Sequence, residues 1–423
     1  MLNDERASTR GERMRLQGAH RFIAAVAIAG VVGLGVSACT IGDQQLSPVA
    51  ETSEALAAPS GDDGESTDTS TTDAKPPKIS IEDGETGVAP AEGVTVTSTS
   101  KLLSVTIKNE EGTEVEAEFN SDKSEWETTE VLGYGRTYTV EARNADGKTS
   151  TSKFSTVNPG WKANVAVGPL DGSTVGVAQA VTFRFGAPIQ DTKAAEDAIT
   201  IETSNDTGGG FFWIDPYELR WRPKEFWEPG TEVSVTTNLY GHNLGGDLWG
   251  GGDEQTVSFT IGDLVEAYVD NDSKTLSVYR DGELVKSLPI ALGRDGQFDT
   301  PNGIYVVGDQ HQSLVMDSRS YGLGLSEGGY VTPVSYATQM SYSGIYVHAA
   351  PWAVGDLGSR NVSHGCINAT TEDAKWFMEY VRRGDPVIVE NTSGGTLTPY
   401  DGLGYWNLDW EMRSGGSAEP LYE

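Results

Sequence analysis

The chain contains the stretch Ser363-His364-Gly365-Cys366-Ile367-Asn368, and Ile345-Tyr346-Val347-His348 ends eighteen positions before Cys366. A free thiol with a pKa near ~8.5 is mostly protonated at neutral pH, so a nucleophilic cysteine needs a base or an electropositive site. Cys366 is the candidate nucleophile and His348 the candidate base. Gly365 allows a sharp turn before the thiol, and the amides of Gly365 and Cys366 are candidates to bind a developing oxyanion. The stretch therefore predicts an enzyme.

The same side chains have a second interpretation as a zinc site. His348, His364 and Cys366 would supply three ligands and water the fourth. No Asp or Glu lies close to His364-Gly365-Cys366 to complete a familiar ligand spacing. A buried inert cysteine is a third alternative, although Ser363-His364-Gly365-Cys366 is too polar for a core segment. We therefore expect no metal and no other cofactor.

The N-terminal segment has the pattern of an export signal. A basic region ends at Arg21, and the apolar run from Phe22 to Val36 suits a signal peptide but is short for a ~30 Å hydrocarbon core. Val36-Ser37-Ala38-Cys39 resembles the bacterial lipobox, in which the cysteine is acylated. We predict a lipoprotein signal peptide over residues 1–38 and a lipid anchor at Cys39, on the outer face of the cytoplasmic membrane. The alternative is a simple membrane anchor with an incidental cysteine.

Composition narrows the function classes. The chain has 62 acidic against 30 basic residues and a formal net charge of −32. Phosphate binding needs basic patches, so nucleic acid is not expected as a partner. The two cysteines, Cys39 and Cys366, are assigned to other roles, so we expect no disulfide.

The length of 423 residues predicts several domains, and 51 glycines with frequent turn pairs favour β structure. Residues 39–78 are rich in Ser, Thr, Asp and Glu and predict a disordered linker. Period-two alternation predicts Ig-like β-sandwiches at 79–159 and 160–262. Residues 263–391 predict a third, catalytic β domain, and residues 392–423 an aromatic extension. The fold class is mainly β.

One helix is expected after the motif. Thr371 is the predicted N-cap, and Ala374, Phe377, Met378 and Val381 share one face that would pack behind the motif loop. In the extension, the rings of Tyr405, Trp406 and Trp410 are expected to dock on a neighbouring domain. Carbohydrate binding is the alternative for these rings.

The arrangement from Ile345 through His348-Ala349-Ala350-Pro351-Trp352 to Asn368 resembles the YkuD-type L,D-transpeptidases, in which a His precedes Ser/Thr-His-Gly-Cys-x-Asn. Two Ig-like modules, a catalytic β-sandwich and an aromatic extension are similar to the lipid-anchored actinobacterial members. The resemblance implies an enzyme of the cell wall whose thiolate attacks residue three of a peptidoglycan stem tetrapeptide and releases D-Ala. The acyl group then passes to the side-chain amine of another stem, which makes a 3→3 cross-link.

The resemblance also implies roles for individual residues. Cys366 would be the nucleophile, His348 the general base, and His364 a residue that shapes the site. Tyr330 falls at a flap position near the oxyanion site. Relatives often have Ser where this chain has Ala349, whose carbonyl would orient His348. Substrate contacts are implied for Tyr330, Ser343, Gly344, Asn368, Met316, Trp352 and Ser363.

Several functions fit this pattern. The leading one is a membrane-anchored L,D-transpeptidase that acts on stem peptides and reacts covalently with carbapenem β-lactams. An L,D-carboxypeptidase would use water as the acceptor of the same acyl-enzyme, and a third variant would attach proteins to peptidoglycan. A wall-binding scaffold is the non-enzymatic alternative, but a scaffold has no need of the pair His348 and Cys366.

Overall fold

The computed structural model describes residues 74–412. The predicted signal peptide, the lipidation site Cys39 and nearly all of the predicted linker lie outside the described residues. The described part is mainly β, as predicted, and its two α-helices are α1 (Thr192–Asp197) and α2 (Thr371–Tyr380). None of the helices in residues 74–412 has the length and apolar character needed to span a bilayer.

Two sheets that share one core form the first sandwich. Their orders are β1-β3-β6-β5 and β2-β8-β7-β4. In β7 the side chains of Tyr138, Val140 and Ala142 are buried while their neighbours alternate outward, and Trp126 and Phe154 complete the core. The period-two prediction is therefore confirmed here. The strands are β1 (Lys78–Ile79), β2 (Thr86–Val88), β3 (Thr95–Thr97), β4 (Leu102–Asn109), β5 (Ala117–Phe119), β6 (Glu125–Thr128), β7 (Thr137–Asn144) and β8 (Thr149–Thr156).

The second sandwich has sheets β10-β12-β15-β14 and β11-β18-β16-β13 and a two-stranded ribbon of β17 and β9. Phe183, Leu219 and Trp227 are fully enclosed in its core. The short helix α1 was not predicted; Asp191 caps it by accepting a hydrogen bond from the Ala194 amide. The strands are β9 (Trp161–Ala163), β10 (Val165–Gly168), β11 (Thr174–Val175), β12 (Val181–Phe185), β13 (Ile199–Thr203), β14 (Gly209–Asp215), β15 (Glu218–Pro223), β16 (Glu232–Thr237), β17 (Leu248–Gly250) and β18 (Gln255–Ile261).

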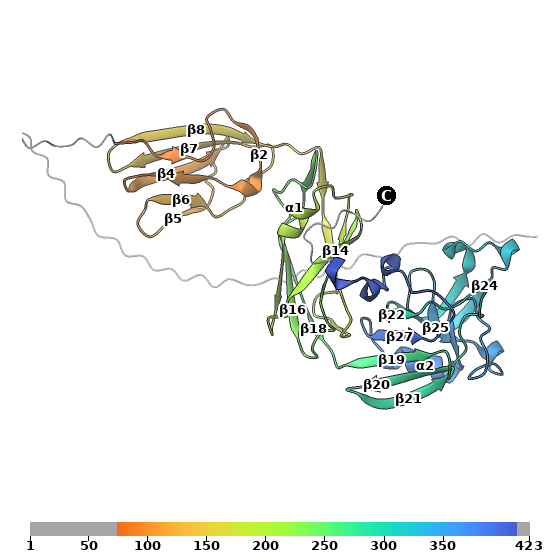
Figure 1. The fold of residues 1–423 in the computed structure, drawn as a ribbon. Helices are drawn as coiled ribbons and strands as arrows, with labels where there is room; N and C mark the ends of the chain where they lie inside the picture. The colour runs from red at the N-terminus through yellow and green to blue at the C-terminus, as the bar shows by residue number, and fades with distance from the viewer. Residues whose placement is uncertain (1–73, 413–423) are drawn as a thin grey trace, which may run out of the picture. The chain divides into compact units, whose positions relative to one another are not determined.

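The third domain consists of a five-stranded sheet, β21-β20-β19-β27-β22, and a four-stranded sheet, β23-β24-β25-β26 (Figure 1). Asp281 and Gly282 have positive φ angles, as the predicted Asp-Gly hairpin between β20 and β21 requires. Val347, Ile367 and Phe377 lie in the core. The strands are β19 (Val265–Asp270), β20 (Thr275–Arg280), β21 (Glu283–Pro289), β22 (Gly303–Val306), β23 (Gln310–Asp317), β24 (Val331–Gln339), β25 (Tyr346–Ala349), β26 (Ile367–Ala369) and β27 (Pro386–Glu390).

Helix α2 packs on β24, β25 and β26 through the predicted apolar face, with Ala374, Phe377 and Met378 buried. The predicted N-cap was one residue too late. Thr370, not Thr371, has the extended backbone of a cap, and its Oγ1 accepts the Asp373 amide at 3.0 Å. The cap falls at Thr370 because β26 ends at Ala369 and the chain turns at once into the helix.

The aromatic extension packs against the second sandwich, as predicted. The Tyr405 hydroxyl donates to the Ala178 carbonyl at 2.7 Å and accepts the Ala180 amide at 3.0 Å. The guanidinium of Arg222 lies 3.8 Å from the ring centroid of Trp406. These contacts cover the outer face of β15, which explains why Arg220 and Arg222 are buried on a strand.

The helix cap gives a stability prediction. Replacement Thr370→Ala removes the acceptor for the Asp373 amide and should lower the free energy of unfolding by about 1 kcal/mol. Thr371→Ala is the matched control, since Thr371 is exposed in the first turn, and it should change stability by less than about 0.5 kcal/mol. Denaturant unfolding of both variants measures the difference. Equal effects would contradict the assignment of the cap to Thr370.

Candidate active site

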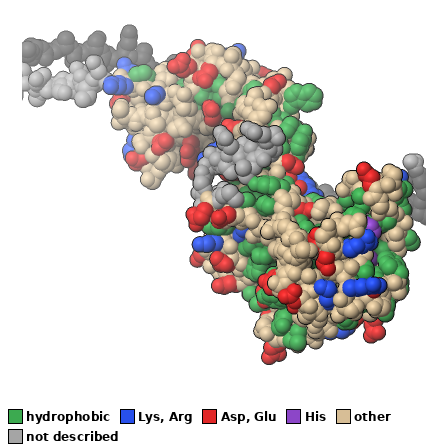
Figure 2. All heavy atoms as spheres, turned by 45° about the vertical axis from the view of Figure 1, so that its right-hand side comes forward, with side chains coloured by type: hydrophobic (Ala, Val, Ile, Leu, Met, Phe, Trp, Pro, Cys, Tyr) green, Lys and Arg blue, Asp and Glu red, His purple; other side chains and the backbone are tan. Residues whose placement is uncertain are grey.

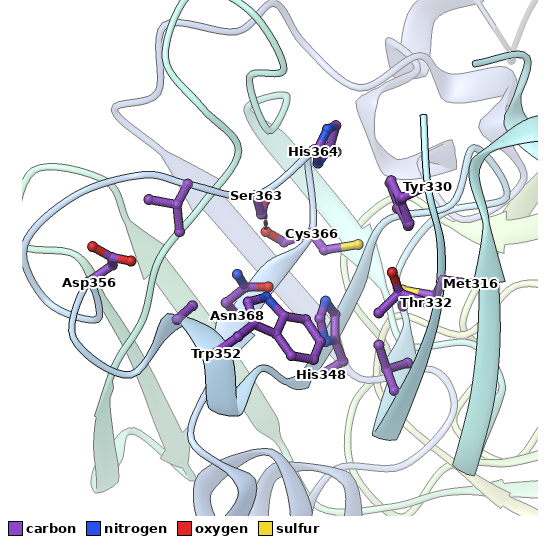
Figure 3. Close-up of a pocket in the computed structure, with 13 residues that line it drawn as sticks. Met316, Tyr330, Thr332, His348, Trp352, Asp356, Ser363, His364, Cys366 and Asn368 are labelled. Atoms are coloured by element: carbon purple, nitrogen blue, oxygen red, sulfur yellow. Dashed lines mark hydrogen bonds between the residues drawn. The ribbon is translucent and has the colours of Figure 1, made fainter. Parts of the chain in front are cut away.

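A pocket of about 430 Å³ opens beside the motif in the third domain. It collects side chains from β23, β24, β25, β26 and the segments that join β23 to β24 and β25 to β26, and these residues are separated by up to about fifty positions in the sequence. Figure 3 shows the side chains arranged around Cys366. The lining residues are Met316, Tyr330, Thr332, Val334, His348, Trp352, Ala353, Asp356, Val362, Ser363, His364, Cys366 and Asn368.

Parallel strand pairing brings the predicted nucleophile and base together. In the register of β25 with β26, Val347 lies opposite Ile367 and His348 opposite Asn368. Cys366 immediately precedes β26, so its side chain enters the pocket close to the strand that carries His348. All of β25 is buried because it lies between β24 and β26. The two groups therefore lie in a buried part of the domain.

The motif loop is held by hydrogen bonds to its own backbone. Ser363 Oγ donates to the Cys366 carbonyl at 2.6 Å and accepts the Gly365 amide at 3.1 Å. Thr300 Oγ1 donates to the Gly365 carbonyl at 2.8 Å. Gly365 has φ +119°, a conformation that a residue with a Cβ rarely adopts. The loop is thus fixed before any substrate binds.

This geometry corrects one expectation. The Gly365 amide was a candidate oxyanion donor, but Ser363 Oγ already accepts its hydrogen bond. The reason is local: a serine two residues earlier reaches back across a tight turn. Gly365 therefore shapes the loop through its backbone conformation, and it is not among the residues that line the pocket.

The Cys366 thiol is buried, and burial raises its pKa to about 11 because a thiolate would be desolvated. A hydrogen bond from the Tyr346 amide opposes this shift. The thiol itself donates to the Gly344 carbonyl at 3.5 Å. At neutral pH the resting cysteine is therefore protonated, and attack on a substrate requires a base.

His348 is oriented by the backbone. Its Nδ1 lies 3.0 Å from the carbonyl oxygen of Ala349, which can only accept, so Nδ1 carries the proton and Nε2 is left as the basic nitrogen. Burial lowers the pKa of His348, and the Ala349 carbonyl partly opposes this effect. The imidazole is neutral at neutral pH. Because the backbone carbonyl of residue 349 accepts the hydrogen bond from His348, Ala349 can orient the imidazole without the hydroxyl of a serine.

His364 contacts the flap, residues 318–330 between β23 and β24. Its Nε2 lies 3.2 Å from the Gly328 carbonyl, and its ring contacts those of Phe298 and Tyr330, with 4.4 and 5.0 Å between centroids. Burial, and secondly the charge of Arg294, lower its pKa. This position suits the shaping role that was expected for His364.

Tyr330 extends from the end of the flap into the pocket. Burial raises the pKa of its hydroxyl, with smaller effects from Cys366 and Tyr321. The phenol therefore stays protonated and can donate a hydrogen bond. In Figure 3 it lies on the same side of Cys366 as Met316 and Thr332.

Ser343 and Gly344 do not line the pocket. The Ser343 amide donates to Asp401 Oδ2 at 2.9 Å, so the extension fixes this turn. A Cβ at Gly344 would lie 2.5 Å from the ring of Tyr321, so a larger residue at this position would clash with the flap. The Gly344 carbonyl lies near Cys366. The Ser343 side chain, for which a substrate contact was expected, lies outside the pocket lining.

The structure adds lining residues that were not predicted. Thr332 is the cross-strand partner of Met316 between β23 and β24, so a correct strand register would have found it. Asp356 and Val362 lie in the irregular segment between β25 and β26, where no periodicity exists to reveal them. Ala353 and Val334 complete this set.

The zinc interpretation is not supported by side-chain placement. Among residues 74–412 no group of three or more His, Cys, Asp or Glu side chains could hold a metal ion. His348 and His364 instead face the carbonyls of Ala349 and Gly328.

Comparison with known proteins places these features in a family. The L,D-transpeptidase catalytic domain (YkuD) matches residues 265–389, and the bacterial Ig domain matches residues 85–243 in a single range that runs through both sandwiches. A solved structure of the LD transpeptidase LdtMt1 in complex with imipenem is 37% identical, covering 54% of this chain and 99% of that chain with a TM-score of 0.47.

Two curated relatives cover more of the chain. L,D-transpeptidase 5 of Mycobacterium tuberculosis (strain H37Rv) is 32% identical over 329 residues, which are 75% of this chain and 71% of the relative. L,D-transpeptidase 2 of M. tuberculosis (strain CDC 1551) is 44% identical over 350 residues, which are 81% of this chain and 85% of the relative. At this identity and coverage the chain belongs to the L,D-transpeptidase family and has its YkuD-type catalytic domain.

Proposed function

We propose that this enzyme is a membrane-anchored L,D-transpeptidase that forms 3→3 cross-links between peptidoglycan stem peptides through an acyl-enzyme on Cys366. The observation that carries the proposal is the buried, backbone-oriented His348 on the strand paired with the segment that carries Cys366. A protonated thiol beside a neutral imidazole is the resting state that general-base activation needs.

In the first half-reaction, Nε2 of His348 takes the thiol proton as Sγ bonds to the carbonyl carbon of residue three in a donor tetrapeptide. The tetrahedral intermediate then breaks its C–N bond, and the proton on His348 passes to the departing amine of D-Ala. In the second half-reaction the side-chain amine of an acceptor stem attacks the thioester and loses a proton to His348. The thiol re-forms by taking that proton, so atoms and charges balance.

The Tyr330 hydroxyl is our candidate for stabilising the oxyanion. It lines the pocket, and its raised pKa keeps it protonated and able to donate. The Gly365 amide does not share this role, because it is already bonded to Ser363, whereas the Cys366 amide stays a second candidate donor. Asn368, Met316, Trp352 and Ser363 line the same pocket and are proposed to contact the stem peptide.

The reaction is tested with a disaccharide-tetrapeptide and mass spectrometry. A dimer lighter than two monomers by one D-Ala is the expected product. Tripeptide alone would indicate an L,D-carboxypeptidase, and no reaction would leave the scaffold alternative. The Cys366→Ala variant should form neither product. Unchanged product in that variant would contradict the nucleophile assignment.

The base is tested by the pH dependence of acylation by a carbapenem, the class of inhibitor bound in the imipenem complex of a relative. Because burial lowers the pKa of His348, protonation should slow acylation only on the acidic side of its ordinary value of 6.5. Replacement His348→Gln should lower the rate by about 10²- to 10⁴-fold and remove this acidic limb. His242→Gln, in the second sandwich, is the control. An acidic limb that persists in His348→Gln would exclude His348 as the base.

Membrane anchoring is proposed from the signal-peptide pattern and the lipobox that ends at Cys39. It would place the enzyme on the outer face of the cytoplasmic membrane, with residues 39–78 as a tether into the cell wall. The mature protein should carry a diacylglycerol-modified N-terminal Cys39 by mass spectrometry, and Cys39→Ala should release it from membranes. A mature N-terminus at residue 40, or an unmodified Cys39, would contradict the anchor.

A further inference from the structure

One carboxylate lines the active-site pocket. Among the described residues that form the pocket wall, Asp356 is the one Asp or Glu, and no Lys or Arg accompanies it there. Asp and Glu side chains are scattered over the face drawn in Figure 2, so an acidic residue at the surface is common in this protein. Asp356 differs from them because it faces the space that substrate enters.

Hydrogen bonds of the Asp356 backbone hold the turn around this residue. After the short helix η4 (Pro351–Ala353), the Asp356 amide donates to the Ala353 carbonyl at 2.9 Å, and its own carbonyl accepts the amides of Ser359 and Arg360 at 3.0 Å. The carboxylate takes no part in these bonds. Removing its charge should therefore leave the turn intact.

Within residues 74–412 the carboxylate of Asp356 is paired with one exposed guanidinium. Arg360 Nε lies 2.5 Å from Asp356 Oδ1, and the Arg360 side chain is 74% exposed whereas that of Asp356 is 19% exposed. Ion pairs with so exposed a partner contribute little, about 0–1 kcal/mol. A carboxylate offers about four lone-pair directions, so Asp356 retains capacity for a second donor from the pocket.

Asp356 is separated from the reacting atoms. In Figure 3 Asp356 lies on the side of Cys366 away from Tyr330 and Met316. Asn368 and Trp352 are drawn between Asp356 and Cys366. The indole of Trp352 is 58% exposed and lines the same pocket. An exposed tryptophan and a carboxylate on the wall of one pocket are both groups that attract a cation. A group held there belongs to the part of a substrate remote from its reacting carbonyl.

We propose that Asp356 binds the side-chain ammonium of residue three of the donor stem and so selects a diamino acid at that position. This inference rests on the proposed function, in which the carbonyl of the same residue is attacked by Cys366. A diamino acid carries its ammonium at the end of a flexible chain, several bonds from that carbonyl. Its alkyl part would lie along Trp352 and its ammonium would reach Asp356.

The test compares two donors that differ in one charge. A tetrapeptide with a diamino acid at position three and the same peptide with the side-chain amine acetylated are mixed with the full-length enzyme, and single-turnover formation of the acyl-enzyme is followed by intact-protein mass spectrometry. The ratio of the two acylation rate constants is the charge preference. Acetylation removes the cation and leaves the scissile bond unchanged.

Three variants separate the explanations. Asp356→Asn should lower the charge preference by about 5- to 10-fold, the size expected for a partly exposed charge-assisted hydrogen bond. Arg360→Gln removes the competing guanidinium and should raise the preference. Glu379→Gln removes a charge from the exposed Lys375–Glu379 pair on α2, away from the pocket, and should leave the preference unchanged.

Carbapenem acylation of the native enzyme is measured in parallel, because it tests Cys366 and His348 without a stem peptide. The folding of Asp356→Asn is checked by denaturant unfolding, which should match that of the native enzyme. An unchanged charge preference in Asp356→Asn would overturn the inference. So would an Arg360→Gln enzyme that loses the preference to the same extent, since the ion pair and not the carboxylate would then carry it.

The two proposals fail in different ways. If the native enzyme reacts with the carbapenem but with neither tetrapeptide, the proposed tetrapeptide donor is wrong, and the inference about Asp356 is overturned with it. If the native enzyme is acylated by both tetrapeptides at equal rates, the donor assignment stands and the role of Asp356 is overturned.

Discussion

Parallel pairing between β25 and β26 is the constraint from which the active site follows. The register sets His348 opposite Asn368, and Cys366 enters the pocket at the residue before the shorter strand begins. Because β25 is buried between two neighbours and α2 covers this sheet, the pair has little freedom to separate. The Ser363 and Thr300 hydrogen bonds then fix the turn at Gly365, directly before Cys366.

The same burial determines the chemistry. Enclosing Cys366 raises its pKa to about 11, and enclosing His348 lowers its pKa, so both groups are held uncharged at neutral pH. An isolated thiolate–imidazolium pair would require desolvated charges, which burial disfavours. The thiol is therefore a weak nucleophile until a base removes its proton.

A second set of interactions joins the extension to the sandwich before the catalytic domain. Arg220 and Arg222 on β15 are buried under Tyr405 and Trp406, and burial lowers the pKa of Arg222 to about 10. Through Asp401 the same extension holds the turn at Ser343, whose neighbour Gly344 contacts the thiol. Side chains of the extension therefore contact both the second sandwich and the turn beside Cys366.

The amino-acid sequence by itself determined the β architecture, the hairpin at Asp281-Gly282, the helix after the motif and the residues Cys366 and His348, because these depend on local alternation, turn chemistry and residue type. The tertiary structure decided what depends on non-local geometry. The helix cap lies at Thr370, and the Gly365 amide donates its hydrogen bond to Ser363. Asp356 lines the pocket, whereas Ser343 does not. No periodic pattern in the sequence governs the segment between β25 and β26, so its side chains acquire neighbours only when the sheet and the flap are assembled.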